Sequence, residues 1–206
     1  MNALLTFSRG MDWFTERLGR SLYWLLLLAV VVSVVNAIGR YGFSMTSNAW
    51  LEMQWYLFAT IFMLGAGYVF LHDQHVRIDV LAQKLPRKVQ VWIDVVGITV
   101  FLIPLCLFII WSSWPPVVRA IETWEFSLSY GGLLRWPLYI LVPIGFMLLA
   151  LQSLSELFKR VAFLTGQGPD PHAKPELSAE ELLLEEIKRE QEQQARAAQA
   201  AGRSGA

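Results

Sequence analysis

Long apolar runs separated by short polar segments dominate the first three quarters of the chain. A helix needs roughly 20 apolar residues to cross the hydrocarbon layer of a bilayer. Helices of water-soluble domains keep a polar face, which these runs lack. The runs without any charged residue are 21–39, 53–71, 95–118 and 136–155. They predict an all-α membrane protein with four transmembrane helices, at about residues 21–41, 50–71, 89–112 and 134–157.

The first 20 residues follow a different pattern. Apolar side chains recur there at steps of three and four, which places them on one side of a helix. They are Leu4, Phe7, Met11, Phe14 and Leu18. We therefore expect residues 1–20 to form an amphipathic helix that lies in the headgroup plane or packs on a partner.

The last part of the chain, residues 165–206, is polar. Glycines and prolines up to Lys174 indicate a linker, and Ser178 with Glu181 makes a capping box for a following helix. This helix is too polar to build a core, so we expect a cytoplasmic tail helix. The predicted organisation is therefore an amphipathic segment, a four-helix transmembrane domain at 21–164, and this tail.

Composition supports a membrane protein and excludes other classes. Hydrophobic residues make up 55% of the chain and charged residues only 17%, with 17 basic and 17 acidic side chains. Nothing in the sequence suggests the clustered basic surface that binds nucleic acid. The single cysteine, Cys106, cannot form an internal disulfide.

Lysines and arginines near the span ends predict the orientation, because cytoplasmic loops retain positive charge. Nine lie at the N-terminus, between spans two and three, and after span four, whereas the opposite side carries only Arg40, Arg119 and Arg135. Both termini should therefore be cytoplasmic. A cleaved signal peptide is disfavoured, because the first apolar run is too long and lacks a small-x-small cleavage site.

Polar residues near the span ends are candidates for interhelical contacts. Asn36 and Arg40 share one face of the first span, and Glu52 begins the second after a short loop. Arg40 and Glu52 either pair or lie separately in the interface. At the opposite side, Asp94 either pairs with a basic residue of the loop before it or stays in water.

Small and aromatic residues suggest packing and anchoring. Gly65 and Gly67 in span two would let another helix approach closely, or face lipid. Trp50 and Trp136 belong with other tryptophans to an interfacial aromatic belt.

Catalytic chemistry is missing from the sequence. There is no nucleophile constellation, phosphate-binding loop or paired cysteines, so we expect no enzyme, cofactor or metal site. The alternative of a redox-complex membrane anchor is weakened by the histidines, since His72 and His75 lie at one helix end and His172 in the tail. Transport by this chain alone is also disfavoured, because no charged group lies at mid-membrane. The residues favour a scaffold.

Several short segments, taken in order, resemble a known family. They are Asn36–Phe43, Trp50–Glu52, Phe62–Tyr68, His75–Leu81, Glu125–Ser127, Gly131–Leu133 and Trp136–Pro137. Their order and spacing over about residues 20–160 resemble the small membrane subunit, of the DctQ type, of tripartite ATP-independent periplasmic (TRAP) transporters. Many members carry a second acidic residue after the position of Glu52, whereas Met53 and Gln54 follow here.

The resemblance implies a non-catalytic scaffold in a sodium-coupled importer of organic acids in the bacterial inner membrane. The implied partners are a large permease subunit, a periplasmic substrate-binding protein and the lipid bilayer, with no nucleic acid. By position in the family pattern, Arg40 and Glu52 would fix the outer hairpin. The residues implied to shape the inner loop are His75, Arg77 and Asp79, and those implied for the outer loop and entry to the fourth span are Glu125, Gly131, Gly132, Trp136 and Pro137.

Overall fold

The computed structural model describes a helical protein. The described residues are 2–43, 47–72, 86–129 and 131–166. Their helices are α1 (Asn2–Gly42), α2 (Asn48–Leu71), α4 (Arg87–Val96), the π-helix η1 (Gly97–Leu102), α5 (Ile103–Glu122) and α6 (Trp136–Leu164). The chain divides into two units, Met1–Pro169 and Asp170–Ala206. The second unit, and with it the predicted tail helix, lies outside the described residues.

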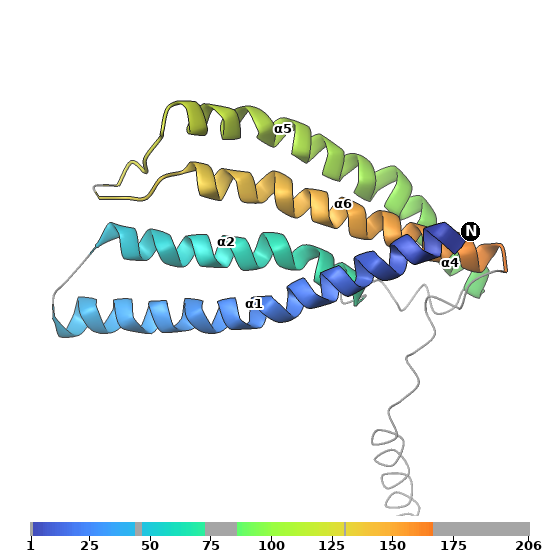
Figure 1. Cartoon of the computed structure of the whole chain (residues 1–206), viewed down its shortest axis with the longest axis horizontal. Coiled ribbons are helices and arrows are strands. Elements are labelled where there is room, and N and C mark those ends of the chain that lie inside the picture. The colour runs from blue at the N-terminus through green and yellow to red at the C-terminus, as the bar shows by residue number, and fades with distance from the viewer. Residues whose placement is uncertain (1, 44–46, 73–85, 130, 167–206) are drawn as a thin grey trace, which may run out of the picture. The chain divides into compact units, whose positions relative to one another are not determined.

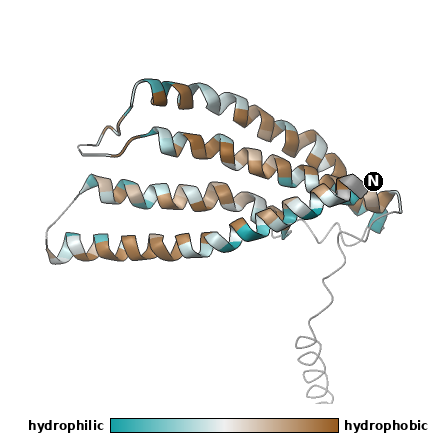
Figure 2. Cartoon of the chain, viewed as in Figure 1, coloured by the Kyte–Doolittle hydropathy of each residue, from teal (hydrophilic) through white to brown (hydrophobic). Residues whose placement is uncertain are grey.

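Four helical stretches are long and apolar enough to cross a membrane, which confirms the prediction of four such helices in an all-α protein. They are Thr6–Gly42, Asn48–Leu71, Arg87–Glu122 and Trp136–Leu164. Hydrophobic residues cover their outward surfaces as well as their contacts with one another (Figure 2). An exposed apolar surface of this size would cause aggregation in water, whereas it is stable in contact with lipid chains. The surface therefore suits a membrane environment.

Helix α6 occupies the centre of the first unit. It packs against α5 on one side and against α2 and α1 on the other, and α1 also packs along α2 (Figure 1). Glycines permit the closest approaches. A Cβ atom added to Gly145 of α6 would lie 2.7 Å from the carbonyl oxygen of Met63 on α2, and one added to Gly19 of α1 would overlap the ring of Tyr68. The close packing of α2 against both neighbours therefore depends on glycine.

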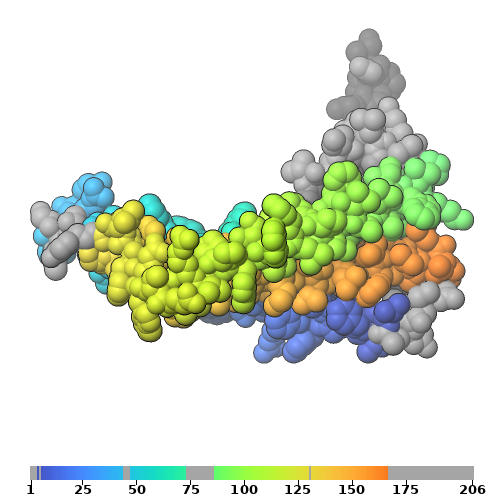
Figure 3. Space-filling view, turned by 90° about the horizontal axis from the view of Figure 1, so that it is seen from above, coloured from blue at the N-terminus to red at the C-terminus, as the bar shows by residue number. Residues whose placement is uncertain are grey.

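Helix α1 is one continuous helix of 41 residues, where the sequence predicted an amphipathic segment before a separate span. At 1.5 Å per residue it is about 60 Å long, roughly twice the thickness of the hydrocarbon layer. Gly10 does not interrupt it, since a mid-helix glycine costs only about 1 kcal/mol. The N-terminal part of α1 lies alongside the C-terminal part of α6, and packing there compensates for that cost (Figure 3).

The third membrane-spanning stretch accommodates three prolines. Pro104 is the second residue of α5 and is separated from η1 by Ile103 alone. A proline clashes with the carbonyl group four residues before it and lacks an N–H donor, and the wider π-turns of η1 are one way to absorb that misfit. The helix continues through Pro115 and Pro116, beyond the predicted span at about 89–112, and ends at Glu122. Their fixed φ angle lies in the helical range, but each of the two removes one backbone N–H donor from α5.

Candidate functional site

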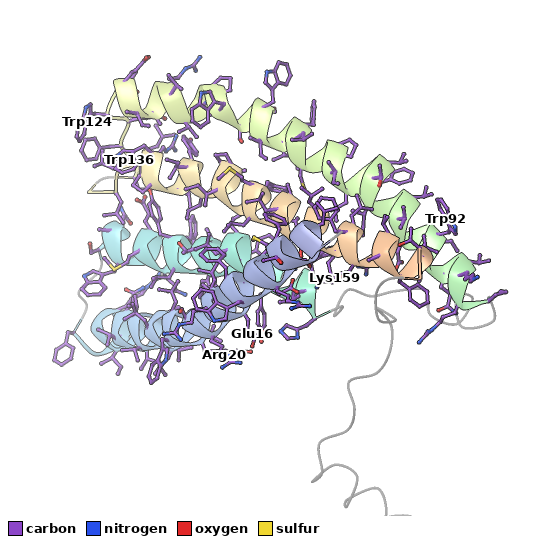
Figure 4. All side chains as sticks on the ribbon, turned by 45° about the vertical axis from the view of Figure 1, so that its right-hand side comes forward. Glu16, Arg20, Trp92, Trp124, Trp136 and Lys159 are labelled. Atoms are coloured by element: carbon purple, nitrogen blue, oxygen red, sulfur yellow. The ribbon has the colours of Figure 1, made fainter. Side chains whose placement is uncertain are left out.

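Polar contacts concentrate at the two ends of the helical unit. We call the end that carries Arg40, Glu52 and residues 123–135 the loop end, and the end that carries the start of α1, the start of α4 and the end of α6 the terminal end. Figure 4 shows Trp124 and Trp136 at the loop end, and Trp92 and Lys159 at the terminal end.

The connection between α5 and α6 folds into a narrow hairpin at the loop end. Phe126 and Leu134 form an isolated antiparallel bridge. The backbone N–H of Ser127 donates to the carbonyl oxygen of Leu133 at 2.9 Å, and that of Arg135 donates to Glu125 at 2.9 Å. The turn contains Gly131 with φ 73°, a left-handed conformation in which glycine carries no steric penalty. The described residues of this loop are therefore held together by backbone hydrogen bonds of the loop itself.

Glu52 fastens this hairpin to α2. Its side chain projects from the first turns of α2, is only 8% exposed, and accepts a hydrogen bond of 2.6 Å from the backbone N–H of Leu133. The hydroxyl groups of Ser127 and Ser129 also donate to this carboxylate. Gly132 leaves room for it, because a Cβ atom there would lie 2.8 and 2.9 Å from the two carboxylate oxygens. A buried carboxylate thus organises the loop through hydrogen bonds.

Two further contacts complete this arrangement. One turn after Glu52, the hydroxyl group of Tyr56 donates to the carbonyl oxygen of Leu134 at 2.5 Å. Within the hairpin, Arg135 forms an ion pair with Glu125 at 2.8 Å, and this hydrogen bond raises the pKa of the Arg135 guanidinium above its ordinary value. We call the whole set the loop-end cluster. Its members are Glu52, Tyr56, Glu125, Ser127, Ser129, Gly132, Leu133, Leu134 and Arg135.

Arg40 is not part of the loop-end cluster. No ion pair joins it to Glu52 among the residues that the structure describes, and its guanidinium carbon lies 5.9 Å from the ring centroid of the neighbouring Tyr41. Of the two arrangements that the sequence left open, the structure therefore has Arg40 and Glu52 apart. Asn36 is half-buried one turn before Arg40.

The glycines of α2 face helices of this same chain. A Cβ atom on Gly65 would lie 3.4 Å from Leu22 of α1, and one on Gly67 would lie 3.8 Å from Gln152 of α6 and from Thr15 of α1. Both glycines therefore lie at contacts between α2 and other helices of this chain, and the approach is closer at Gly65.

The other predicted positions lie as follows. Trp50 is exposed near the start of α2, Trp136 begins α6 half-buried, and Pro137 follows in the first turn of α6. His75, Arg77 and Asp79 lie outside the described residues.

A second polar cluster, which sequence reasoning missed, joins α1 to α6 at the terminal end. The hydroxyl groups of Ser8 and Ser155 are 2.7 Å apart, and both side chains are buried. Asp12 accepts hydrogen bonds from Gln152 at 2.9 Å and from Ser155 at 3.2 Å, and pairs with Lys159 at 2.8 Å. The polar side of this part of α1 therefore faces protein, and Leu4, Phe7 and Phe14 are exposed.

The same cluster continues through α6 to α4. Arg160, whose side chain is 3% exposed, pairs with Glu156 at 2.5 Å and with Asp94 of α4 at 3.1 Å. Asp94 thus pairs with α6, a partner that the sequence did not suggest. A signal was present in the polar run Gln152–Arg160, which interrupts an otherwise apolar helix at steps of three and four. We call this set the terminal-end network. Its members are Ser8, Asp12, Thr15, Asp94, Gln152, Ser155, Glu156, Lys159 and Arg160.

Neither polar set has the composition of a reaction centre. Within the described ranges, no group of three or more His, Cys, Asp and Glu side chains is placed to hold a metal ion. His72 contacts Glu16, with its Nε2 atom 2.8 Å from the carboxylate. Each carboxylate of the two sets accepts hydrogen bonds or forms ion pairs with donors of the protein itself. This is typical of groups that stabilise a fold.

Comparisons with known proteins address the family directly. Residues 29–163 match the family described as "Tripartite ATP-independent periplasmic transporters, DctQ component". A putative TRAP transporter small permease protein of Haemophilus influenzae is 34% identical over 90 residues, covering 44% of this chain and 55% of the relative. The aligned part thus spans about half the length of that relative. Since the family match extends over more than half of the chain and includes all four apolar helices in whole or in part, this protein belongs to the DctQ family and is a multi-pass membrane subunit of a TRAP transporter, not an enzyme.

Proposed function

We propose that the chain is the non-catalytic scaffold subunit of a sodium-coupled secondary transporter that imports organic acids. Its partners would be a large permease subunit in the membrane and a soluble periplasmic substrate-binding protein. Membership of the DctQ family supports a transport role within a multi-part system. It also favours this function over the redox-anchor alternative.

The position of the charged groups carries the scaffold proposal. In the described helices, residues 21–39, 53–71, 95–118 and 136–155 contain no Asp, Glu, Lys or Arg. A path for an anion or a cation through the bilayer needs polar groups or broken helices near mid-membrane. This chain concentrates its charges at the loop end and the terminal end, where they join its own helices. It is therefore built to hold a shape, and substrate and ion would be bound by another subunit.

The two polar clusters give this scaffold its stiffness. The loop-end cluster joins α2 to the α5–α6 hairpin, and the terminal-end network joins α1 and α4 to α6. Helices held at both ends resist sliding and rocking, the motions by which transporter domains alternate their access. We infer that the chain forms a static wall beside a large subunit that moves.

We place the protein in the bacterial inner membrane with both termini in the cytoplasm. The loop end would face the periplasm, and the terminal end would lie at the cytoplasmic surface. The excess of lysine and arginine at the terminal end supports this orientation. Residues 1–20 would then extend through the headgroup region, residues 21–164 would form the transmembrane domain, and residues 165–206 would be a cytoplasmic tail.

Co-purification with the large permease tests the proposal. A tagged chain, co-expressed with the large permease of the same transporter and solubilised in mild detergent, should recover that permease in a one-to-one ratio. Vesicles containing both subunits, with the binding protein outside, should take up an organic acid when a sodium gradient is imposed. Vesicles with this chain alone should show no uptake. Recovery of a lone stable monomer, or uptake by this chain alone, would contradict the scaffold role.

A further inference from the structure

Two tryptophans and two arginines form a stripe on the surface of α1. Trp13, Arg17, Arg20 and Trp24 are separated by steps of four, three and four residues, which places them on one face of the helix. All four are exposed, Trp13 by 67% and Trp24 by 76%. Together with Glu16 and Ser21 they line an open pocket of about 270 Å³. We call this pocket the α1 groove.

The α1 groove has an excess of positive charge. The carboxylate of Glu16 is matched within the protein, because it lies 2.9 Å from Nε of Arg20 and 2.8 Å from Nε2 of His72. Figure 4 shows Glu16 and Arg20 projecting together from α1. The guanidinium group of Arg17 has no ion pair among the residues that the structure describes, and the backbone carbonyl oxygen of Arg17 accepts a hydrogen bond from the hydroxyl group of Ser21. Arg17 therefore presents an uncompensated guanidinium group to whatever occupies the groove.

The groove lies where α1 changes from polar to apolar. The uncharged run begins at Ser21, so the arginines stand just before it and Trp24 just inside it. Tryptophan rings favour this boundary between headgroups and acyl chains. If the terminal end faces the cytoplasm, the groove opens on the leaflet that carries anionic lipids.

We infer that the α1 groove binds the phosphate group of an anionic phospholipid. A guanidinium group can donate two parallel hydrogen bonds to a phosphate, which an ammonium group cannot do in the same geometry. Arg17 and the Nη atoms of Arg20 supply such donors, and the indole ring of Trp24, on the apolar side of the arginines, offers apolar surface to the attached acyl chains, whereas Trp13 borders the groove on its polar side. A free phosphate ion shares the headgroup chemistry, but it makes no contact that requires the apolar ring of Trp24. The lipid is therefore the occupant that uses the whole groove.

Lipid titration followed by native mass spectrometry tests this inference. The purified full-length protein would be titrated in detergent with phosphatidylglycerol and, separately, with phosphatidylcholine. Each arginine near an anionic headgroup contributes about a fivefold change in affinity. We therefore expect Arg17→Gln to weaken phosphatidylglycerol binding about fivefold and Arg17→Lys to restore only part of the loss. The wild-type protein should prefer phosphatidylglycerol to phosphatidylcholine.

Arg40→Gln is the matched control, since Arg40 is an exposed arginine near the opposite end of the same helix. It should leave phosphatidylglycerol binding unchanged. Equal losses in Arg17→Gln and Arg40→Gln, or equal binding of the two lipids, would overturn the inference by showing non-specific attraction. Inorganic phosphate should fail to displace the lipid, and displacement would assign the groove to a free anion. Loss of the Arg17 effect in the complex with the large permease would show that protein covers the groove, which also overturns it.

Discussion

The carboxylate of Glu52 and the backbone N–H of Leu133 are joined by a hydrogen bond of 2.6 Å, although 81 positions separate them in the chain. One partner belongs to α2 and the other to the hairpin between α5 and α6. This contact links the first pair of membrane helices to the second pair at the loop end.

Removing the Glu52 carboxylate should loosen that link. We expect Glu52→Ala to lower the free energy of unfolding by about 1–3 kcal/mol, since it leaves a partly buried N–H without its acceptor. Glu52→Gln should cost less, because its amide oxygen can still accept. Arg40→Ala should have little effect, and the double mutant should be additive. Reversible unfolding in mixed micelles, followed by circular dichroism, measures these values. A coupling between positions 40 and 52 would contradict the structure.

Gly132 should tolerate no side chain. A Cβ atom there would lie 2.5 Å from Cβ of Ser127 and within 3 Å of both Glu52 carboxylate oxygens. We expect Gly132→Ala to destabilise the protein by about 1–3 kcal/mol through overpacking. Gly42→Ala is the matched control, because nothing lies within 4 Å of its added Cβ atom. Thermal unfolding monitored by tryptophan fluorescence compares the two, and equal melting temperatures would refute the packing of the loop-end cluster.

Gly145 of α6 should be as sensitive to alanine substitution as Gly132. Alanine there would push its Cβ atom against the backbone of Met63, which cannot move without shifting α2. We expect Gly145→Ala to lower the free energy of unfolding by about 1–3 kcal/mol. Gly97→Ala, in a helical backbone with open space around it, should be neutral or slightly stabilising. The same unfolding assay in detergent compares them, and a neutral Gly145→Ala would mean that α2 and α6 are farther apart.

Arg160 should be the most sensitive member of the terminal-end network. Its loss leaves the carboxylates of Glu156 and Asp94 without their shared guanidinium partner. Breaking a buried ion pair costs about 3–5 kcal/mol, so Arg160→Met should destabilise the protein by that amount. The exposed Arg119 provides the control, and Arg119→Met should change stability by less than about 0.5 kcal/mol. Adding Asp94→Asn and Glu156→Gln to Arg160→Met should recover part of the loss, and a further loss would argue against this network.

Single cysteines test the proposed orientation. In a Cys106→Ala background, Ser129→Cys would report on the loop end and Thr165→Cys on the terminal end. A maleimide that does not cross membranes should label intact cells at position 129, and position 165 only after the inner membrane is opened. These residues are exposed, so access alone decides the outcome. The opposite pattern would invert the topology.

The sequence was most informative where the membrane itself sets the rule. Four uncharged runs predicted four long apolar helices, because lipid tolerates few charges and requires satisfied backbone groups. The hydrogen-bond partner of Glu52 could not be predicted from the sequence, for a different reason. Arg40 was the obvious candidate by charge, whereas the actual donor is a backbone N–H at Leu133, and backbone donors leave no mark in a sequence.

The N-terminal part of α1 shows a second limit. Asp12 lies off the apolar stripe that the sequence predicts for residues 1–20, on a side of the helix that would face water in a soluble protein. In the structure this part of α1 packs against α6, and polar groups of the two helices turn toward one another. Asp12 and Thr15 therefore face Gln152 of α6. The periodicity identifies the two faces of this helix, but the neighbouring helix decides which face is buried.

The central position of α6 has a consequence for biogenesis. The ribosome makes α1 and α2 first, and these two can pair as soon as both have left the translocon, because they contact each other directly. For α5, the main packing partner among the described helices is α6, the final span to be synthesised. Until α6 has been inserted, the face of α5 that packs against α6 is exposed to lipid. Truncation before residue 136 would thus leave the third span without its packing partner α6, and quality-control proteases could recognise this unpaired helix.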